Sequence, residues 1–125
     1  MNDKAKTLEM KNWAVVGATD KKNKFGYKIY KKLKKHNYNV YPVNPNLENI
    51  DGDKCYADLA SIPAKIEVVD MVVNPKIAIK IMKNIKAEGI EYVWLQPGTR
   101  SSQIRSFAKN NNINLIESCI LRNLD

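Results

Sequence analysis

The chain has 125 residues, of which 44% are hydrophobic and 27% are charged. This size is typical of one domain with one core, and no apolar run is long enough to cross a bilayer. Lysine and arginine total 21 against 13 acidic residues, which gives a formal net charge of +8. The excess favours an anionic partner, but a lysine-rich surface that serves only solubility explains the charge equally well.

The two cysteines and the N-terminus indicate the cellular setting. Cys55 and Cys119 have neither the spacing of a metal site nor that of a disulfide framework. The first six residues are mostly polar and form no apolar signal segment. We therefore expect a cytoplasmic protein with reduced thiols. We expect residues 1–11 to form a lead-in, as a short helix or a tail, and residues 12–125 to form a single domain.

The first pattern along the chain is strand, loop and helix. Residues 13–16 are continuously apolar, as in a strand buried on both faces, and Gly17 allows the backbone to turn sharply. Residues 25–36 follow with apolar side chains on one helical face and lysines on the other, and Asn37 is suited to end this helix. A ligand site is expected in the loop between strand and helix.

The same alternation continues through the rest of the chain. Further strands are expected at residues 39–43, 68–73, 92–95 and 113–117. Further helices are expected to begin after Asn74 and after Ser101 or Ser102, and Gly89 is suited to end the first of them. Residues 47–55 are typical of a surface turn, and residues 58–63 of one helical turn.

Strands that alternate with helices at this spacing predict an α/β protein with right-handed crossovers. The expected architecture is a three-layer, Rossmann-like fold with five or six mainly parallel strands. Ligands of such sheets bind beyond the carboxyl ends of the strands, so the loops that follow the strands are the candidate site.

Known site motifs exclude several functions. The dinucleotide fingerprint needs three closely spaced glycines and an acidic residue after the second strand, but Gly17 is followed next by Gly26, and the second strand ends in Asn44. Neither a P-loop nor a Ser/His/Asp, Cys/His or paired-carboxylate set is present. A phospho-receiver domain would need an Asp where Asn74 stands. His36, the single histidine, is expected at the surface. We therefore expect no catalytic residues and no metal site.

Four motifs together resemble a known family. Residues 15–19 read Val-Val-Gly-Ala-Thr, residues 41–45 read Tyr-Pro-Val-Asn-Pro, residues 93–98 read Val-Trp-Leu-Gln-Pro-Gly, and Cys119 follows near the end. The sequence resembles the small, stand-alone CoA-binding proteins, whose domain is similar to the CoA-binding domain of succinyl-CoA synthetase α subunits. The resemblance extends from about residue 12 to residue 121.

The resemblance implies non-covalent, non-catalytic binding of coenzyme A or an acyl-CoA. It places the nucleotide phosphates at the first loop, the nucleotide end at the second strand, and the pantetheine arm at the third and fourth strands. The site residues that it implies are Gly17, Ala18, Thr19, Lys24, Asn44, Pro45, Val73, Asn74, Pro75, Gln96, Pro97 and Gly98. Lys22 is added because it lies in the same lysine-rich loop before the first helix, where it would meet the same anion. Lys24 stands where many members have Arg, and Gly26 stands where a Ser is common.

Some alternatives stay open at this point. The Cys119 thiol is expected to be buried and inert, with a disulfide to the CoA thiol as the other reading. The chain could also be an NAD(P)-type sensor or redox domain, although the missing glycines and acid argue against it. A basic nucleic-acid or protein-interaction module would use the lysines of the first helix, but no aromatic residues for base stacking are grouped with them. No membrane partner is expected, and the sequence names no protein partner.

Overall fold

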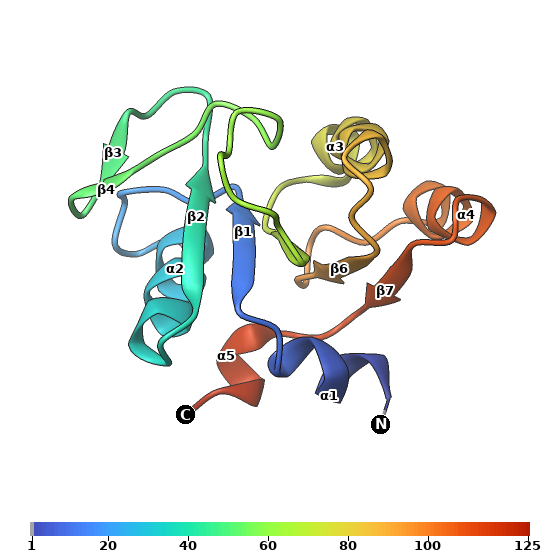
Figure 1. Ribbon diagram of the computed structural model, residues 1–125, viewed down its shortest axis with the longest axis horizontal. Helices are drawn as coiled ribbons and strands as arrows, with labels where there is room; N and C mark the ends of the chain where they lie inside the picture. The colour runs from blue at the N-terminus through green and yellow to red at the C-terminus, as the bar shows by residue number, and fades with distance from the viewer. Residues whose placement is uncertain (1) are drawn as a thin grey trace.

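A computed structural model describes residues 2–125 of the chain. Its centre is a five-stranded sheet in the order β2-β1-β5-β6-β7, in which all neighbouring strands are parallel (Figure 1). The strands are β1 Asn12–Val16, β2 Asn39–Val43, β5 Val68–Met71, β6 Tyr92–Leu95 and β7 Asn114–Ile116. The predicted α/β class and the five-stranded parallel sheet are confirmed.

Helices cover both faces of this sheet and make three layers. One core cluster joins the sheet to α3 and α4, and the other joins it to α2 and α5, with α1 at its margin. The helices are α1 Asp3–Leu8, α2 Phe25–Lys35, α3 Pro75–Ala87, α4 Ser102–Asn110 and α5 Ile120–Asn123. Because β1 leads into α2 on one face and β5 leads into α3 on the other, the sheet has its topological switch point between β1 and β5.

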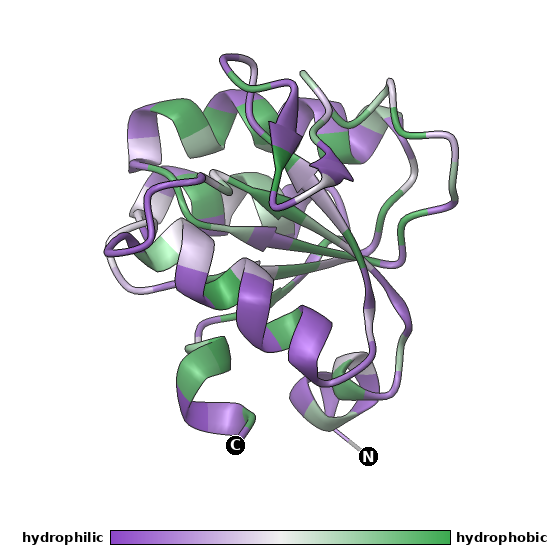
Figure 2. Ribbon diagram, turned by 90° about the vertical axis from the view of Figure 1, so that its left-hand side faces the viewer, coloured by the Kyte–Doolittle hydropathy of each residue, from purple (hydrophilic) through white to green (hydrophobic). Residues whose placement is uncertain are grey.

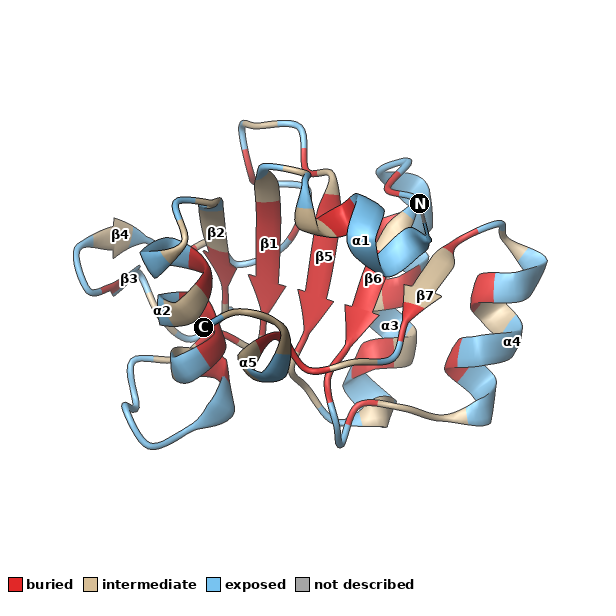
Figure 3. Ribbon diagram, turned by 90° about the horizontal axis from the view of Figure 1, so that it is seen from below, coloured by how far each residue is buried: buried red, intermediate tan, exposed pale blue. Residues whose placement is uncertain are grey.

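The central strands are buried on both faces, as their continuous apolar sequences predict. Trp13, Ala14 and Val15 of β1 are all fully buried, and β1, β5 and β6 are buried along most of their length (Figure 3). Helix α2 instead presents hydrophobic and hydrophilic residues on different sides (Figure 2). Burying a large apolar side chain contributes roughly 1.5–3 kcal/mol, so this layered core supplies the main stabilising free energy.

The residues before β1 form a helix and not a tail. Thr7 of α1 is fully buried, and its Oγ1 accepts a hydrogen bond of 2.8 Å from Nε1 of Trp94 in β6. The Tyr38 hydroxyl donates to the carbonyl of Leu8. Helix α1 is therefore attached to the core through polar contacts, and the division at residue 11 stays a prediction.

Two short elements lie outside the predicted pattern. Residues 49–54 form a hairpin of β3 Asn49–Ile50 and β4 Asp53–Lys54, where only a surface turn was expected. Its turn residues Asp51 and Gly52 both have positive φ, which fits an Asp-Gly hairpin turn. Helix α5 has four residues, too few for a periodic signal. The predicted helix ends at Asn37 and Gly89 are confirmed by left-handed φ values of 66° and 73°.

No helix in residues 2–125 is both long enough and apolar enough to span a bilayer.

Candidate functional site

A cavity of about 500 Å³ opens at the carboxyl edge of the sheet, at the switch point between β1 and β5. We call it the switch-point pocket. It is formed by the loops that follow β1, β5 and β6, together with the start of α2. Its lining residues are Gly17, Thr19, Lys21, Lys24, Phe25, Gly26, Val72, Val73, Asn74, Pro97, Gly98 and Thr99. The site therefore lies where ligands of open parallel sheets bind.

Two glycines bring α2 close to the end of β1. A β-carbon on Gly26 would lie 2.1 Å from the Gly17 carbonyl oxygen, and one on Gly17 would lie 2.3 Å from the Val72 carbonyl oxygen. Gly17 also has a φ of 97°, which side chains rarely allow. A serine at position 26 does not fit this backbone, so Gly26 is explained by close packing.

The first turn of α2 lacks the caps that the other long helices have. The Asn74 Oδ1 accepts from the N–H of Ile77 at the start of α3, and the Ser101 Oγ accepts from the N–H of Ile104 at the start of α4. At α2 the N-cap is Lys24, which makes no such bond. The hydrogen bonds within residues 2–125 give no acceptor to the N–H groups of residues 25–27.

These free N–H groups face an electropositive setting. The first turn of α2 contains no acidic residue, and Lys21 and Lys24 line the pocket beside it. The N-terminus of a helix carries roughly half a positive charge, which adds to the two ammonium charges. Free N–H donors, the helix dipole and two lysines together suit a phosphate group.

Asn44 stabilises the loop between β1 and α2 by a hydrogen bond. Its Nδ2 donates to the Ala18 carbonyl at 2.9 Å, and its Oδ1 accepts from the N–H of Asn46 at 2.9 Å. Both ends of the amide are therefore occupied within the protein. Pro45, the next residue, is exposed. Neither residue lines the pocket, so their predicted contact with the nucleotide end is still untested.

Gln96 points into the core, where it meets a buried acid that the sequence analysis missed. Its Nε2 donates to Oδ1 of Asp70 at 2.6 Å, and its Oε1 accepts from the N–H of Ile120 at 3.3 Å. Asp70 is fully buried in β5, and its Oδ2 has no partner among the described residues. Desolvation outweighs the Gln96 hydrogen bond and raises the Asp70 pKa to about 7. The sequence did contain a signal for this buried acid, because Asp70 is the one acidic residue in the otherwise apolar run 68–73.

Thr99 shapes the far side of the pocket. It is buried, and its Oγ1 donates to the Val73 carbonyl at 2.7 Å, beyond the end of β5. The preceding Gly98 has a φ of 93°, which makes the sharp turn after β6. This hydrogen bond joins the β5 and β6 loops into one wall.

The pocket brings together part of the predicted set. The predicted residues that line it are Gly17, Thr19, Lys24, Val73, Asn74, Pro97 and Gly98. Those outside the lining are Ala18, Lys22, Asn44, Pro45, Pro75 and Gln96. Lining residues absent from the predicted set are Lys21, Phe25, Gly26, Val72 and Thr99. Which of them contacts a ligand stays a prediction.

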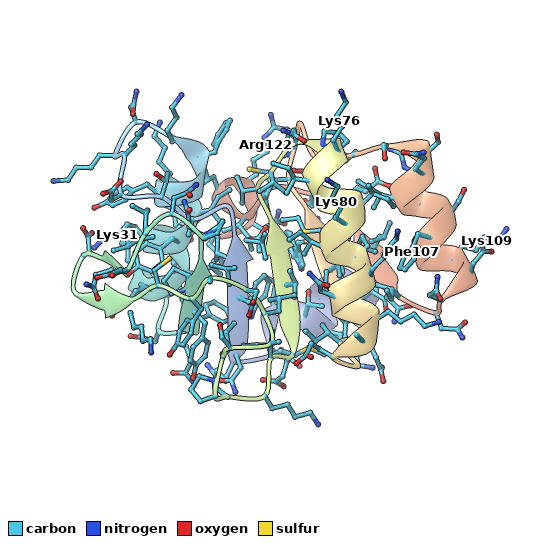
Figure 4. All side chains as sticks on the ribbon, turned by 90° about the horizontal axis from the view of Figure 1, so that it is seen from above. Lys31, Lys76, Lys80, Phe107, Lys109 and Arg122 are labelled. Atoms are coloured by element: carbon cyan, nitrogen blue, oxygen red, sulfur yellow. The ribbon has the colours of Figure 1, made fainter. Side chains whose placement is uncertain are left out.

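Lys22 lies in a second, more basic groove, on the outer side of α2. This lysine groove has a volume of about 480 Å³ and is lined by Lys22, Tyr27, Lys28, Lys31, Lys32, Lys35 and Leu121. Lys31 forms an ion pair of 3.0 Å with Asp51 of the β3–β4 turn. Figure 4 shows Lys31 on the α2 side of the molecule. Lys76 and Lys80 lie on α3, away from this groove.

The remaining candidate groups do not enter the pocket. Cys55 and Cys119 are both buried and unpaired, and neither lines it. His36 lies at the surface end of α2, as expected, and its Nε2 is 2.7 Å from the carbonyl oxygen of Asp125. Residues 2–125 contain no cluster of three or more His, Cys, Asp or Glu that could hold a metal ion.

Comparison with known protein families shows the family of this chain. The family described as "CoA binding domain" matches residues 11–125. The chain belongs to this CoA-binding domain family. The expected resemblance is thereby confirmed, and coenzyme A as the ligand class is confirmed at the level of the family.

Relatives of this family member include both enzymes and small proteins. An ADP-forming acetate–CoA ligase of Methanocaldococcus jannaschii is 30% identical over 85% of this chain, which corresponds to 16% of the ligase. The α subunit of a Pyrococcus furiosus ADP-forming acetate–CoA ligase II is 32% identical over 64% of this chain and 18% of the subunit. The chain thus spans less than a fifth of the length of these curated relatives.

Solved structures of small proteins match over nearly their whole length. A conserved hypothetical protein of Pyrococcus furiosus is 33% identical, with a TM-score of 0.87, and the match covers 91% of this chain and 99% of that one. A hypothetical protein of Pyrococcus horikoshii is 32% identical, with a TM-score of 0.89, covering 98% and 89%. The family fold therefore also occurs as a separate small protein.

Proposed function

We propose that this protein binds coenzyme A or an acyl-CoA non-covalently in the switch-point pocket and catalyses no reaction on it alone. The observation that carries the proposal is the uncapped first turn of α2, flanked by Lys21 and Lys24, in a member of a CoA-binding family. Coenzyme A is an anion with phosphates at its nucleotide half. These phosphates would accept hydrogen bonds from the free N–H groups in the first turn of α2.

The energetics favour a phosphate at this position. A hydrogen bond to a charged group contributes about 1.5–3 kcal/mol, and the free N–H groups of residues 25–27 add no cost of breaking protein contacts. Thr19 supports the same loop, since its Oγ1 accepts from the N–H of Lys21 at 3.3 Å. The loop is thus held in shape by its own hydrogen bonds before a ligand enters.

The non-catalytic part of the proposal rests on the chemistry of the lining. The residues that line the pocket include no carboxylate, imidazole or thiol that could act as a general acid, base or nucleophile. The related ligases carry more than four-fifths of their length outside the matched region. We therefore assign to this chain the binding step, and not the ligase reaction of the longer relatives.

A binding comparison tests the proposal. A ligand that binds only the folded state raises the free energy of unfolding by RT ln(1 + [L]/Kd), so coenzyme A should raise Tm and give heat in calorimetry. NAD and NADP should have little effect, because the residue that follows β2 is Asn44 and not an acid that could bind the ribose hydroxyls. Stabilisation by NAD without stabilisation by coenzyme A would refute the assignment. Mass spectrometry of gently purified protein would identify any retained ligand directly.

A further inference from the structure

The lysine groove on the outer side of α2 lies outside the pocket that the proposed function uses. Lys28, Lys32 and Lys35 line it at positions i, i+4 and i+7, so they follow one face of the helix. At 1.5 Å of rise per residue, these positions span roughly 10 Å along the helix axis. Among the ion pairs of residues 2–125, none includes any of the three. We call them the lysine strip, because they form a row of positive charge without a counter-charge.

The lysines of α2 beside the β3–β4 hairpin do have acidic partners. Lys31 Nζ lies 3.0 Å from Oδ2 of Asp51, and Lys34 forms an ion pair with Asp53. Both acids belong to the hairpin. The protein therefore neutralises the lysines on the hairpin side of α2 and leaves those of the lysine strip free.

The stability of α2 does not explain the lysine strip. Like charges three or four residues apart on a helix repel each other, and α2 contains no acidic residue that would offset the repulsion. The helix dipole favours Lys32 and Lys35 in the last turn but disfavours Lys28 close to the first turn. A surface that serves only solubility does as well with charges of both signs interspersed. An anionic partner explains the strip better.

Apolar groups lie among these lysines and narrow the class of partner. Leu121 of α5 and Tyr27 of α2 both line the groove and are partly exposed. The Tyr27 hydroxyl donates to Asp51 at 2.6 Å, and Lys31 Nζ lies 5.9 Å from the ring centroid. A ring that is held and partly covered in this way is a poor platform for a nucleic-acid base, whereas hydrocarbon side chains can pack beside it. The groove therefore favours a protein partner with both acidic and apolar side chains.

We infer that the lysine groove is a docking site for an acidic amphipathic helix of a partner protein. Glutamates at positions i, i+4 and i+7 of such a helix match the spacing of the lysine strip, and a leucine beside them packs on Leu121. This inference goes beyond the proposed function and does not depend on it. The two sites are neighbours, because Lys21 lines the switch-point pocket and the next residue, Lys22, lines the groove. A docked partner therefore contacts the loop that flanks the pocket.

The test uses two labelled peptides of the same composition, each about 18 residues long so that it can form a helix. In the patterned peptide, three glutamates and a leucine occupy one face at the spacing of the lysine strip. In the scrambled peptide, the glutamates are distributed around the helix. Each partly exposed ion pair should contribute about two- to fivefold in affinity, so the patterned peptide should bind roughly tenfold more tightly. Fluorescence anisotropy at constant ionic strength measures both.

Charge reversal in the groove should remove this preference. The groove variant combines Lys28→Glu with Lys32→Glu. The matched control combines Lys76→Glu with Lys80→Glu, which makes the same charge change at the same i, i+4 spacing on exposed residues of α3 (Figure 4). The control should keep the roughly tenfold preference. A peptide with lysines in place of the patterned glutamates should bind the groove variant about fivefold more tightly than the control, because the charges are exchanged across the same contact.

Three results would overturn the inference, and none of them bears on ligand binding in the switch-point pocket. Equal affinity of the wild type for the two peptides, including no binding of either, would mean that the lysine strip does not match an acidic helix. Equal losses in the groove and control variants would reduce the effect to net charge. Tighter binding of a labelled DNA strand, or of vesicles with anionic lipids, than of the patterned peptide would assign the groove to nucleic acid or to a membrane surface. Circular dichroism checks that both variants fold, and Lys28→Gln with Lys32→Gln replaces a groove variant that does not.

Discussion

The carbonyl oxygen of Gly17 lies only 2.1 Å from the point where a β-carbon of residue 26 would stand. This contact sets the position of the α2 N-terminus above the end of β1. Gly17 and Gly26, nine positions apart in the chain, are so close that no side chain fits between them. The geometry of the loop between β1 and α2 therefore depends on residue 26 having no β-carbon.

Gly26→Ala should destabilise the protein by roughly 1–3 kcal/mol, because the added methyl group forces the helix away from the loop. Helix propensity alone predicts the opposite sign, a gain of up to about 1 kcal/mol for Gly→Ala in a helix. Urea unfolding of the two proteins distinguishes these outcomes. An unchanged or higher free energy of unfolding would mean that α2 can move without cost.

Lys24→Ala should weaken coenzyme A binding about tenfold or more, since a charge-assisted contact to phosphate contributes roughly 1.5–3 kcal/mol. Lys35→Ala is the matched control, because Lys35 is exposed near the end of α2 and lies outside the switch-point pocket. Screened surface charges contribute far less, so this variant should bind as the wild type does. Calorimetry at constant ionic strength measures both. Equal losses in the two variants would indicate a diffuse charge effect and not a site.

The lysine groove gives a separate test of the nucleic-acid alternative. If Lys28→Ala and Lys32→Ala lowered the affinity for DNA or RNA, with a steep dependence on salt, the basic face of α2 would have that role. We expect weak binding that the variants change little. Fluorescence anisotropy with a labelled duplex and a labelled single strand would measure it.

Asp70 should make stability depend on pH. Its pKa is near 3.8 when unfolded and about 7 when folded. Between these values the unfolded state loses the proton while the folded state keeps it, so the free energy of unfolding falls as pH rises from about 4 to about 7. The contribution is a few kcal/mol. Asp70→Asn should remove this decline, seen as a smaller change in Tm between pH 5 and pH 8. An identical decline in the variant would assign the effect to another group.

Thr7→Val should cost about 1–3 kcal/mol of stability, because the buried Nε1–H of Trp94 loses its acceptor. Valine has nearly the same shape as threonine, so packing changes little. Thr7→Ser keeps the hydroxyl and should lose less than Thr7→Val. Tryptophan fluorescence during urea unfolding reports the transition. Equal stability of the wild type and Thr7→Val would show that the Trp94 indole finds water or another partner.

Much of the fold could be predicted because its signals are local. The strands of a sheet covered on both faces are continuously apolar, and Asn74-Pro75 at the start of α3 and Gly89 after it mark helix ends through their own backbone preferences. Helix α5 gave no such signal, because four residues are shorter than two helical turns.

The directions of polar side chains at the strand ends could not be read from the sequence. Asn44 and Gln96 each follow a strand, as ligand-facing residues do, but both satisfy buried groups 26 residues away in the chain, the Ala18 carbonyl and the Asp70 carboxyl. Lys21 and Lys22 are neighbours in a loop without periodicity, and they face different cavities. The direction of each of these side chains depends on tertiary contacts with distant parts of the chain, which the local sequence does not indicate.

The uncapped start of α2 has a consequence for the motion of the free protein. Without a capping side chain, the first turn should open and close readily, and its amide hydrogens should exchange with solvent far faster than those of Ile29 or Leu33 in the buried turns. A bound phosphate would act as the missing cap. Hydrogen–deuterium exchange at residues 25–27 should then slow on ligand binding. The ligand would in this way supply the N-terminal cap of α2 that no side chain of the protein provides.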